Sequence, residues 1–161
     1  FSKVVKIVAG GEQRYDSVYE GLKACGDSEY VFIHDGARPF VTEEILQRGY
    51  EAARKYGTGI AGVLSKDTVK IVDGKKNVIE TPLRDRVWIV QTPQIFEYNL
   101  VRCAYDRLQL FDKTGITDDA MVVEEMGNHT VHMVPGDYTN IKITTPDDLD
   151  VAAQFMQKIS G

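Results

Sequence analysis

The chain is poor in cysteine and has no excess of positive charge, and each shortage excludes a class of protein. Its two cysteines, Cys25 and Cys103, are too far apart to form a metal-ligand motif. We expect both to be buried, non-catalytic free thiols in a reducing compartment, the cytoplasm. Lysine and arginine total 19 against 24 aspartates and glutamates, so the net charge is −5. A nucleic-acid polymer is therefore not an expected partner, whereas a single nucleotide can still bind.

The sequence also lacks a long hydrophobic run and an N-terminal targeting signal. No stretch approaches the ~18 apolar residues of a membrane span, and the start, Phe1-Ser2-Lys3, has neither a methionine nor a signal-peptide profile. We therefore expect no membrane partner and a chain that begins inside a domain. With 43% hydrophobic residues and no repeat or linker, residues 1–161 are expected to form a single domain.

What the chain does contain is an alternation of apolar runs and helical periodicity. Strands are predicted at Val4–Ala9, at the buried run Tyr30–Ile33 and at Gly59–Leu64. Helices are predicted in the segments between them. This alternation favours an α/β fold with a mostly parallel sheet. Further strands are predicted at 87–90, 129–134 and 140–144, and further helices around 100–108, at 117–127 and from 146 onwards.

One region interrupts the alternation. Two β-favouring segments, 67–72 and 77–81, flank Asp73-Gly74-Lys75-Lys76, which has the turn chemistry of a β-hairpin. Two strands alone are marginally stable in water, so an arm at about 67–86 needs a surface to lie on. A second subunit is the natural candidate, and we expect a homodimer.

Polar residues follow the predicted central strand directly, in the segment His34-Asp35-Gly36-Ala37-Arg38-Pro39. In open α/β sheets, ligands bind at the carboxyl ends of strands. Asp35 offers oxygens to a cation or a hydroxyl, and Arg38 offers a planar fork of donors for phosphate. The alternative is a structural turn with a surface salt bridge. Lys142 is a second candidate, because a lysine inside a short apolar strand must reach solvent or meet a fixed anion.

Two predicted helix starts complete the set of motifs. Gly10-Gly11 precedes the helix that opens at Arg14, and such a turn exposes backbone N–H groups that can hold an anion or the edge of a base. Thr117 with Asp118 and Asp119 forms a good capped N-terminus on structural grounds alone.

Taken together, these motifs resemble the 2-C-methyl-D-erythritol 4-phosphate cytidylyltransferases of the non-mevalonate isoprenoid pathway. The matching segments, in the family's order, are Gly10-Gly11 with Arg14 and Asp16-Ser17-Val18, His34–Pro39, Asp67-Thr68, Arg84, Thr92-Pro93-Gln94, Thr117–Ala120 and Asn140–Thr144. The resemblance implies a Rossmann-like nucleotidyltransferase sheet with a hairpin arm that clasps a partner subunit. It also implies transfer of a cytidylyl group from CTP to the polyol phosphate, with Mg²⁺ and release of pyrophosphate.

The resemblance assigns roles residue by residue. Residues implied to bind the nucleotide are Gly11, Glu12, Ser17 and Asp35, with the first three reading cytosine and Asp35 near the ribose and the metal-bound triphosphate. Residues implied to bind the substrate phosphate are Arg38, Thr68, Thr92, Lys142 and the partner arm's Arg84. Lys142 and Arg84 are the implied catalytic residues. For His34 we expect a structural, hydrogen-bonded role.

The chain departs from the family at its start. The family's glycine-rich loop, with an arginine and a lysine that grip the triphosphate, precedes the equivalent of Lys3 and has no counterpart here. We expect a fragment rather than a decayed homologue, because the downstream positions are intact. Two rival functions stay open: a cytidylyltransferase for another polyol phosphate such as ribitol 5-phosphate, and a non-catalytic dimerisation or nucleotide-binding module.

Overall fold

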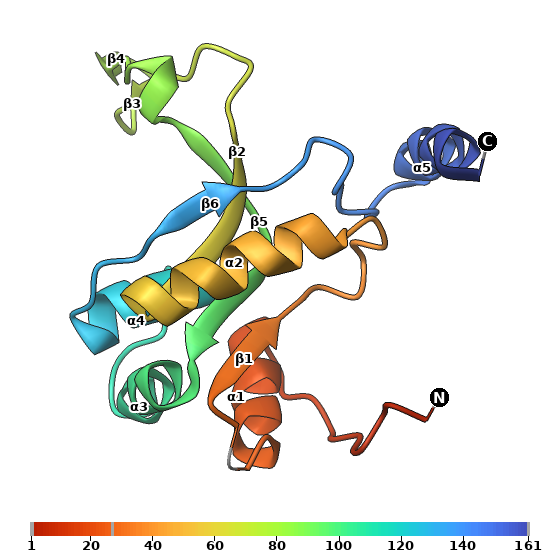
Figure 1. Ribbon diagram of the computed structural model, residues 1–161. Coiled ribbons are helices and arrows are strands. Elements are labelled where there is room, and N and C mark those ends of the chain that lie inside the picture. Colours follow the sequence, from red (N-terminus) through yellow and green to blue (C-terminus); the bar gives the residue numbers. More distant parts are fainter. Residues whose placement is uncertain (1, 27, 161) are drawn as a thin grey trace.

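Helices and strands alternate along the chain as its sequence predicts (Figure 1). The computed structural model describes residues 2–26 and 28–160. Its helices are α1 (Arg14–Ala24), α2 (Glu43–Tyr56), α3 (Tyr98–Leu108), α4 (Asp119–Gly127), α5 (Pro146–Ser160) and the short 3-10 helix η1 (Arg84–Arg86). Its strands are β1 (Tyr30–Ile33), β2 (Thr58–Leu64), β3 (Ile71–Val72), β4 (Val78–Glu80), β5 (Trp88–Glu97) and β6 (Met133–Pro135).

The main sheet has the strand order β1-β5-β2-β6. Strand β5 pairs antiparallel with both of its neighbours, and β2 pairs parallel with β6. Strands β1, β2 and β6 therefore run in one direction and β5 runs in the other. The expected α/β fold is confirmed, with a common direction for three of these four strands.

Helices cover both faces of this sheet, as the alternation of side chains on β5 illustrates. Ile95 lies against Gly49 of α2 on one face. Phe96 points to the other face and joins the main core, which α1, α3 and α4 complete. Both side chains are fully buried. Because successive strand residues point to opposite faces, β5 is apolar on both sides over this stretch.

Helix α2 begins and ends where the sequence predicts. Thr42 is its N-cap, and Gly57 ends it in the left-handed region at φ 77°, where glycine carries no steric penalty. Ile45 and Ala52 on its inner face are buried, whereas Tyr56 at its end is exposed.

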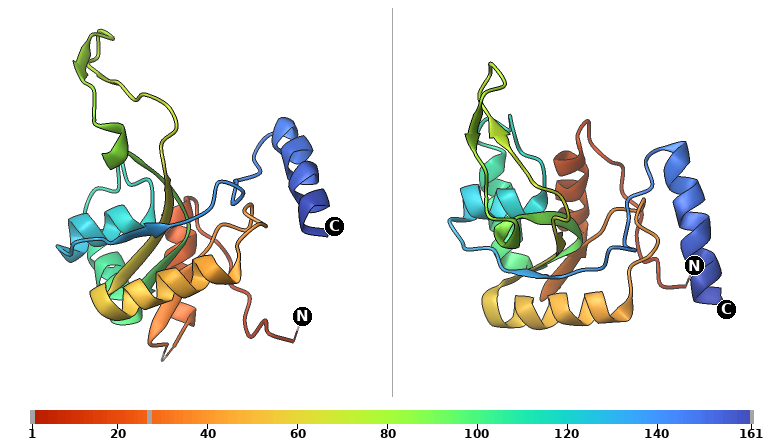
Figure 2. Two further views of the ribbon diagram at one scale, coloured as in Figure 1. Left: turned by 45° about the horizontal axis from the view of Figure 1, so that its top comes forward. Right: turned by 90° about the horizontal axis from the view of Figure 1, so that it is seen from above.

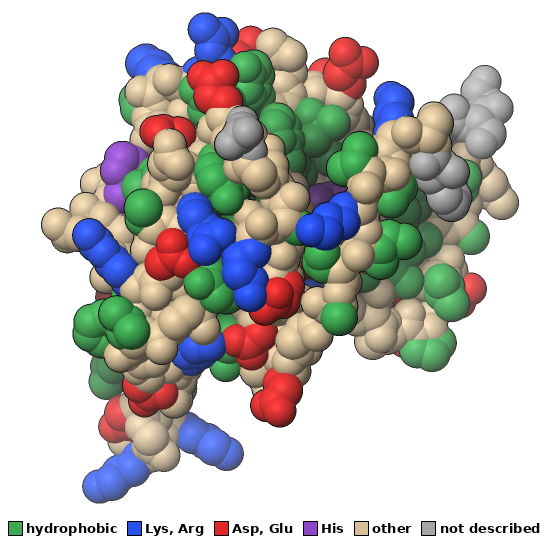
Figure 3. Space-filling view, turned by 90° about the horizontal axis from the view of Figure 1, so that it is seen from below, with side chains coloured by type: hydrophobic (Ala, Val, Ile, Leu, Met, Phe, Trp, Pro, Cys, Tyr) green, Lys and Arg blue, Asp and Glu red, His purple; other side chains and the backbone are tan. Residues whose placement is uncertain are grey.

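The predicted hairpin is present and protrudes from the body. Strands β3 and β4 pair antiparallel and form a separate two-stranded sheet. Figure 2 shows the hairpin reaching away from the helices, and Figure 3 shows Lys and Arg side chains at its end. Its apolar side chains are all exposed: Ile71, Val72, Val78 and Ile79. The arm therefore contributes apolar surface but little to this chain's own core.

The predicted strand Val4–Ala9 is wrong. The segment has no regular structure and runs away from the sheet (Figure 2). A strand is stabilised by hydrogen bonds to a neighbour, and within residues 2–26 and 28–160 none pairs with this segment. Val5 is 98% exposed and Ile7 89% exposed as a result.

The predicted ends of later strands also differ from the structure. The run Val87–Val90 does not end at Gln91 but continues as β5 to Glu97, with an irregular register opposite Ala61. The predicted strand 129–134 is reduced to Met133–Pro135. Residues 140–144 are an extended loop, tied to the body by the Ile143 N–H, which donates to the Ala37 carbonyl. Lys142 therefore lies on a loop and not inside a strand.

Two expectations about burial are wrong. Cys25 and Cys103 are free thiols as expected, but both are exposed, because Cys25 is the C-cap of α1 and Cys103 lies on the outer side of α3. Strand β1 is an edge strand with one buried face, so Val31 is buried while Phe32 is exposed. Along the described part of the chain, no helix is both long and apolar enough to cross a membrane.

Candidate active site

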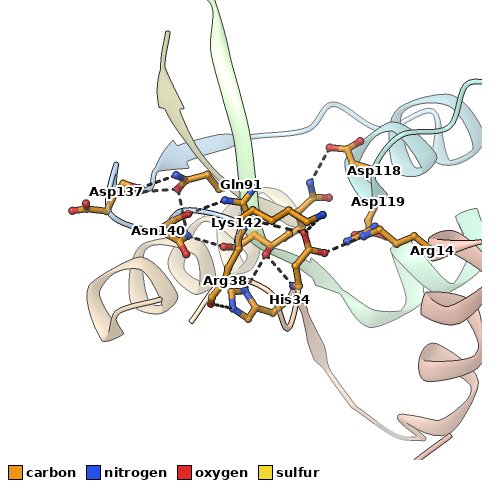
Figure 4. A network of polar contacts seen from close by, with 12 residues as sticks. Arg14, His34, Arg38, Gln91, Asp118, Asp119, Asp137, Asn140 and Lys142 are labelled. Carbon is orange, nitrogen blue, oxygen red and sulfur yellow. Dashed lines mark hydrogen bonds and ion pairs between the residues drawn. The ribbon is translucent and has the colours of Figure 1, made fainter. Parts of the chain in front are cut away.

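A polar cavity of about 300 Å³ lies where β1 ends, beside the irregular stretch of β5. Charged side chains from four separate segments line it: Arg14, Asp35, Arg38, Asp118 and Lys142. Figure 4 shows Arg14, Arg38, Asp118 and Lys142 approaching one another from α1, the loop after β1, the N-terminus of α4 and the 140–144 loop. Three cations and two carboxylates therefore surround one small space.

Asp35 is the centre of this group. Its Oδ1 accepts a hydrogen bond from Arg14 Nε at 3.1 Å, and its Oδ2 is 3.1 Å from Lys142 Nζ. Arg38 Nε is 3.9 Å from Oδ2. Burial alone would raise the pKa of Asp35, but the hydrogen bonds and charges of Lys142 and Arg14 outweigh it and lower the pKa. The carboxylate is therefore ionised at neutral pH and holds two cations in place.

The guanidinium of Arg14 is also paired with Asp119. Its two Nη groups donate to Asp119 at 3.0 and 2.8 Å, a bidentate contact with a fully buried carboxylate. Burial alone would lower the pKa of Arg14, but Asp119 and Asp35 raise it, so the guanidinium stays charged. The hydroxyl of Tyr105 donates to the same carboxylate at 2.5 Å. Burial and the charge of Asp119 both raise the pKa of Tyr105.

Arg38 keeps hydrogen-bonding capacity for a ligand. Its Nη1 donates to the Asn140 carbonyl at 2.7 Å, whereas its Nε is buried and has no hydrogen-bond partner in the described part of the chain. Burial lowers the pKa of Arg38, partly offset by Asp35. The Arg38 guanidinium lines the cavity, and a charged donor there is suited to an anion.

His34 and Thr92 are engaged with the protein itself. The Thr92 hydroxyl accepts from the Asp35 backbone N–H at 3.0 Å and lies 3.0 Å from His34 Nδ1. His34 Nε2 lies 2.9 Å from the Arg38 carbonyl. The expected structural role of His34 is confirmed. Thr92 lines the cavity, but these contacts occupy its hydroxyl.

The predicted turn before α1 is closed by Ser17. The Gly11 N–H donates to the Ser17 hydroxyl at 3.1 Å, and that hydroxyl donates to the Gln13 carbonyl at 3.2 Å. A Cβ at Gly10 would lie 2.8 Å from Ser17 Oγ, so a larger residue would displace the hydroxyl that closes the turn. Glu12 is exposed on the same turn.

The structure brings together some of the predicted site residues and separates others. Asp35, Arg38, Thr92 and Lys142 line one cavity. Thr68 and Arg84 do not line it: both are exposed on the arm, where Arg84 Nη1 donates to the Lys66 carbonyl at 3.2 Å.

Several residues that line the cavity had no predicted binding role: Arg14, Gln91, Gln94, Thr117 and Asp118. The N-cap of α4 is Asp118 and not Thr117, because Asp118 Oδ1 accepts from the Met121 N–H. Thr117 instead lines the cavity, and its hydroxyl lies 3.8 Å from the Met121 sulfur, a weak acceptor. The sequence contains one indication of a second role at this helix start. Two adjacent aspartates supply one more carboxylate than a cap requires.

A cationic cavity at the carboxyl end of β1 in an α/β sheet has the place and charge that suit a phosphate ligand, as in the nucleotidyltransferase class. Residues 1–158 match the sequence profile of IspD, 2-C-methyl-D-erythritol 4-phosphate cytidylyltransferase, and the chain belongs to this family. The enzyme of that name from Clostridium botulinum strain Langeland is 48% identical over 160 residues, 99% of this chain and 69% of that protein.

Solved structures agree with this assignment. The 4-diphosphocytidyl-2C-methyl-D-erythritol synthase of Anaerococcus prevotii superposes with a TM-score of 0.88 at 40% identity, over 94% of this chain and 70% of that one. The 2-C-methyl-D-erythritol 4-phosphate cytidylyltransferase of Thermus thermophilus superposes with a TM-score of 0.79 at 33% identity, over 93% of this chain and 72% of that one. The resemblance read from the sequence motifs is confirmed.

Proposed function

We propose that this chain forms the substrate-phosphate site of an enzyme that transfers a cytidylyl group from CTP to 2-C-methyl-D-erythritol 4-phosphate. A phosphate oxygen of the polyol substrate attacks the α-phosphorus of CTP, a new P–O bond forms, and pyrophosphate leaves. The family match favours this reaction over the ribitol 5-phosphate alternative. The product is a precursor in isoprenoid biosynthesis.

The convergence of Arg38 and Lys142 on one cavity is the observation that carries the proposal. The attacking phosphate is already an anion, so the reaction requires alignment of two polyanions and stabilisation of charge at phosphorus. Lysine and arginine supply that stabilisation as fixed positive charges. We assign the transferring phosphate to Lys142 and the substrate phosphate to Arg38, with the Thr117 hydroxyl as a further donor and Thr92 at the cavity wall.

Magnesium is proposed to arrive on the triphosphate and not to occupy a site built by this domain. Among the described residues there is no group of three or more metal-ligating side chains. Asp35, the ligand considered from the sequence, already has one oxygen engaged by Arg14 and the other by Lys142. When bound, Mg²⁺ would neutralise charge on the phosphates of CTP.

Base selection is proposed for the turn before α1, and completion of the phosphate site for the arm. Gly11, Glu12 and Ser17 lie on or beside one turn that the Ser17 hydroxyl holds in a fixed shape, and a fixed turn suits the edge of one base. The apolar hairpin is proposed to pack on a second copy of the chain and to deliver Thr68 and Arg84 to its cavity. The two free cysteines support a cytoplasmic location.

A pyrophosphate-release assay on the full-length protein tests the proposal. With 2-C-methyl-D-erythritol 4-phosphate as acceptor, we expect turnover with CTP and much slower turnover with UTP, because UTP leaves polar groups of the base site unpaired. Ribitol 5-phosphate serves as the control acceptor. Equal rates with both acceptors would contradict the proposed substrate, and equal rates with CTP and UTP would contradict the proposed base site.

A further inference from the structure

Asp119 is a buried carboxylate that neither lines the cavity nor caps its helix. It is the first residue of α4 and is fully buried, while Asp118 performs the capping and faces the cavity. A buried charge is costly unless it is paired, and a buried ion pair contributes little net stability. A contribution to stability is therefore a weak explanation for its presence.

The partners of Asp119 fix the orientation of Arg14. Oδ1 accepts from Tyr105 and from Arg14 Nη1, and Oδ2 accepts from Arg14 Nη2. Both Nη groups of Arg14 are thereby turned away from the cavity. Arg14 donates from its Nε to Oδ1 of Asp35, which leaves Oδ2 of Asp35 to Lys142.

Without Asp119, Arg14 is no longer limited to one oxygen of Asp35, with the other oxygen left to Lys142. Arginine prefers a bidentate contact in which two parallel N–H groups engage both oxygens of a carboxylate. A released Arg14 can turn such a fork onto Asp35 and compete with Lys142 for Oδ2. Lys142 would then lose the contact that holds its ammonium group at the cavity.

We propose that Asp119, supported by Tyr105, is a positioning residue that acts through Arg14 and Asp35 on Lys142. It keeps the Nη groups of Arg14 occupied, so that Asp35 can hold Lys142 in the orientation that contacts the transferring phosphate. This inference rests on the proposed function, because it assumes that Lys142 acts at that phosphate.

The first test compares Asp119→Asn with Asp106→Asn in the full-length protein. Asp106 is a matched control, because it accepts from Tyr19 at 2.7 Å and from Arg102 at 3.0 Å on the exposed side of α3. We expect Asp119→Asn to lower kcat for pyrophosphate release about 10- to 100-fold while KM for CTP stays within about threefold, since misplaced groups lose alignment more than binding. Asp106→Asn should leave both constants unchanged. Equal losses in the two variants would overturn the proposal.

A double-mutant cycle with Lys142→Ala tests whether Asp119 acts through Lys142. If it does, Asp119→Asn should lower kcat by less than about twofold when Lys142 is already absent, because the effects of coupled residues do not add. A loss as large as in the wild-type background would mean an independent role. Should Asp119→Asn fail to fold, Tyr105→Phe removes one hydrogen bond to Asp119, and a smaller kcat loss that also vanishes in Lys142→Ala is expected.

A measurement without substrate separates this inference from the proposed function. Acetic anhydride labels unpaired amines, and mass spectrometry compares Lys142 with the exposed Lys75 of the hairpin turn. We expect Asp119→Asn to raise the relative labelling rate of Lys142 severalfold, since an amine released from its contact with the Asp35 carboxylate is more accessible to the reagent. An unchanged rate overturns the positioning role even if the enzyme is active. A wild-type protein without cytidylyl transfer contradicts the proposed function, while the labelling result still decides whether Asp119 controls Lys142.

Discussion

The cavity and the arm place their proposed functional residues in opposite physical settings. Around the cavity, Asp35 and Arg38 contact partners from α1 and the 140–144 loop, so one chain holds them in position. On the arm, Thr68 and Arg84 are exposed at the base of a two-stranded hairpin. The difference indicates that the cavity is preorganised within one chain, whereas the role proposed for the arm depends on a second copy of the chain.

The largest effect is expected from Lys142→Ala, which removes a cation from the cavity without disturbing the core. The side chain is 44% exposed and forms an ion pair with Asp35, so the free energy of unfolding should change by no more than about 1 kcal/mol. Turnover should fall about 100-fold or more, since a fixed charge at phosphorus is lost. Thermal melting and steady-state kinetics on the full-length protein provide the two measurements. A marked loss of stability with normal turnover of the folded fraction would make Lys142 structural.

Mixed dimers test the arm directly. An Arg84→Ala subunit has an intact cavity but an incomplete arm, and a Lys142→Ala subunit has the reverse. Turnover should fall about 100-fold or more in the Lys142→Ala homodimer and about 10- to 100-fold in the Arg84→Ala homodimer. After subunit exchange, half of the dimers are mixed and each has one of two sites complete, so activity should approach about a quarter of wild type.

Confirmed exchange without recovery would mean that Arg84 does not act on a partner subunit. The control is a mixture of wild-type protein and Lys142→Ala, in which every wild-type cavity keeps a complete arm opposite it. That mixture should retain about half of the wild-type activity per total subunit.

A smaller effect, on stability, should distinguish the two regions. The Asn140 side chain is fully buried and donates to the Thr92 carbonyl at 2.8 Å. Asn140→Ala leaves that carbonyl unpaired, and we expect a cost of about 1–3 kcal/mol in the free energy of unfolding. Asp73→Ala on the arm removes acceptors for the N–H groups of Lys75 and Asn77 but should leave the urea midpoint unchanged. Equal midpoint shifts would show that the hairpin and the body unfold as one unit.

The smallest effect concerns pH. Because Lys142 and Arg14 lower the pKa of Asp35, its contribution to stability is fully present above the unfolded value of about 3.9 and is lost as pH falls through the lower folded pKa. The difference in unfolding free energy between wild type and Asp35→Asn should therefore be constant above about pH 5 and shrink below about pH 4. Urea titrations across this range measure it. A difference that already shrinks near pH 6 would contradict the ion pairs at Asp35.

Local patterns predicted the elements that depend on nearby residues. Helix α2 follows from a threonine at one end, a glycine at the other and an apolar face between them, and the hairpin follows from Asp73-Gly74 between two β-favouring runs. The segment Val4–Ala9 has an equally good strand pattern but remains irregular. A strand requires a neighbour, and local sequence does not specify one.

The sequence by itself determined the α/β class, the arm and the motifs that identify the family, because periodicity, turn chemistry and motif order are properties of neighbouring residues. Tertiary structure alone decided that Asp119, 105 positions after Arg14, turns that guanidinium toward Asp35. It also decided that Lys142 lies on a loop beside Asp35, and that both cysteines face solvent. Such contacts depend on which distant segments the packing brings within hydrogen-bonding distance, and no local pattern encodes that distance.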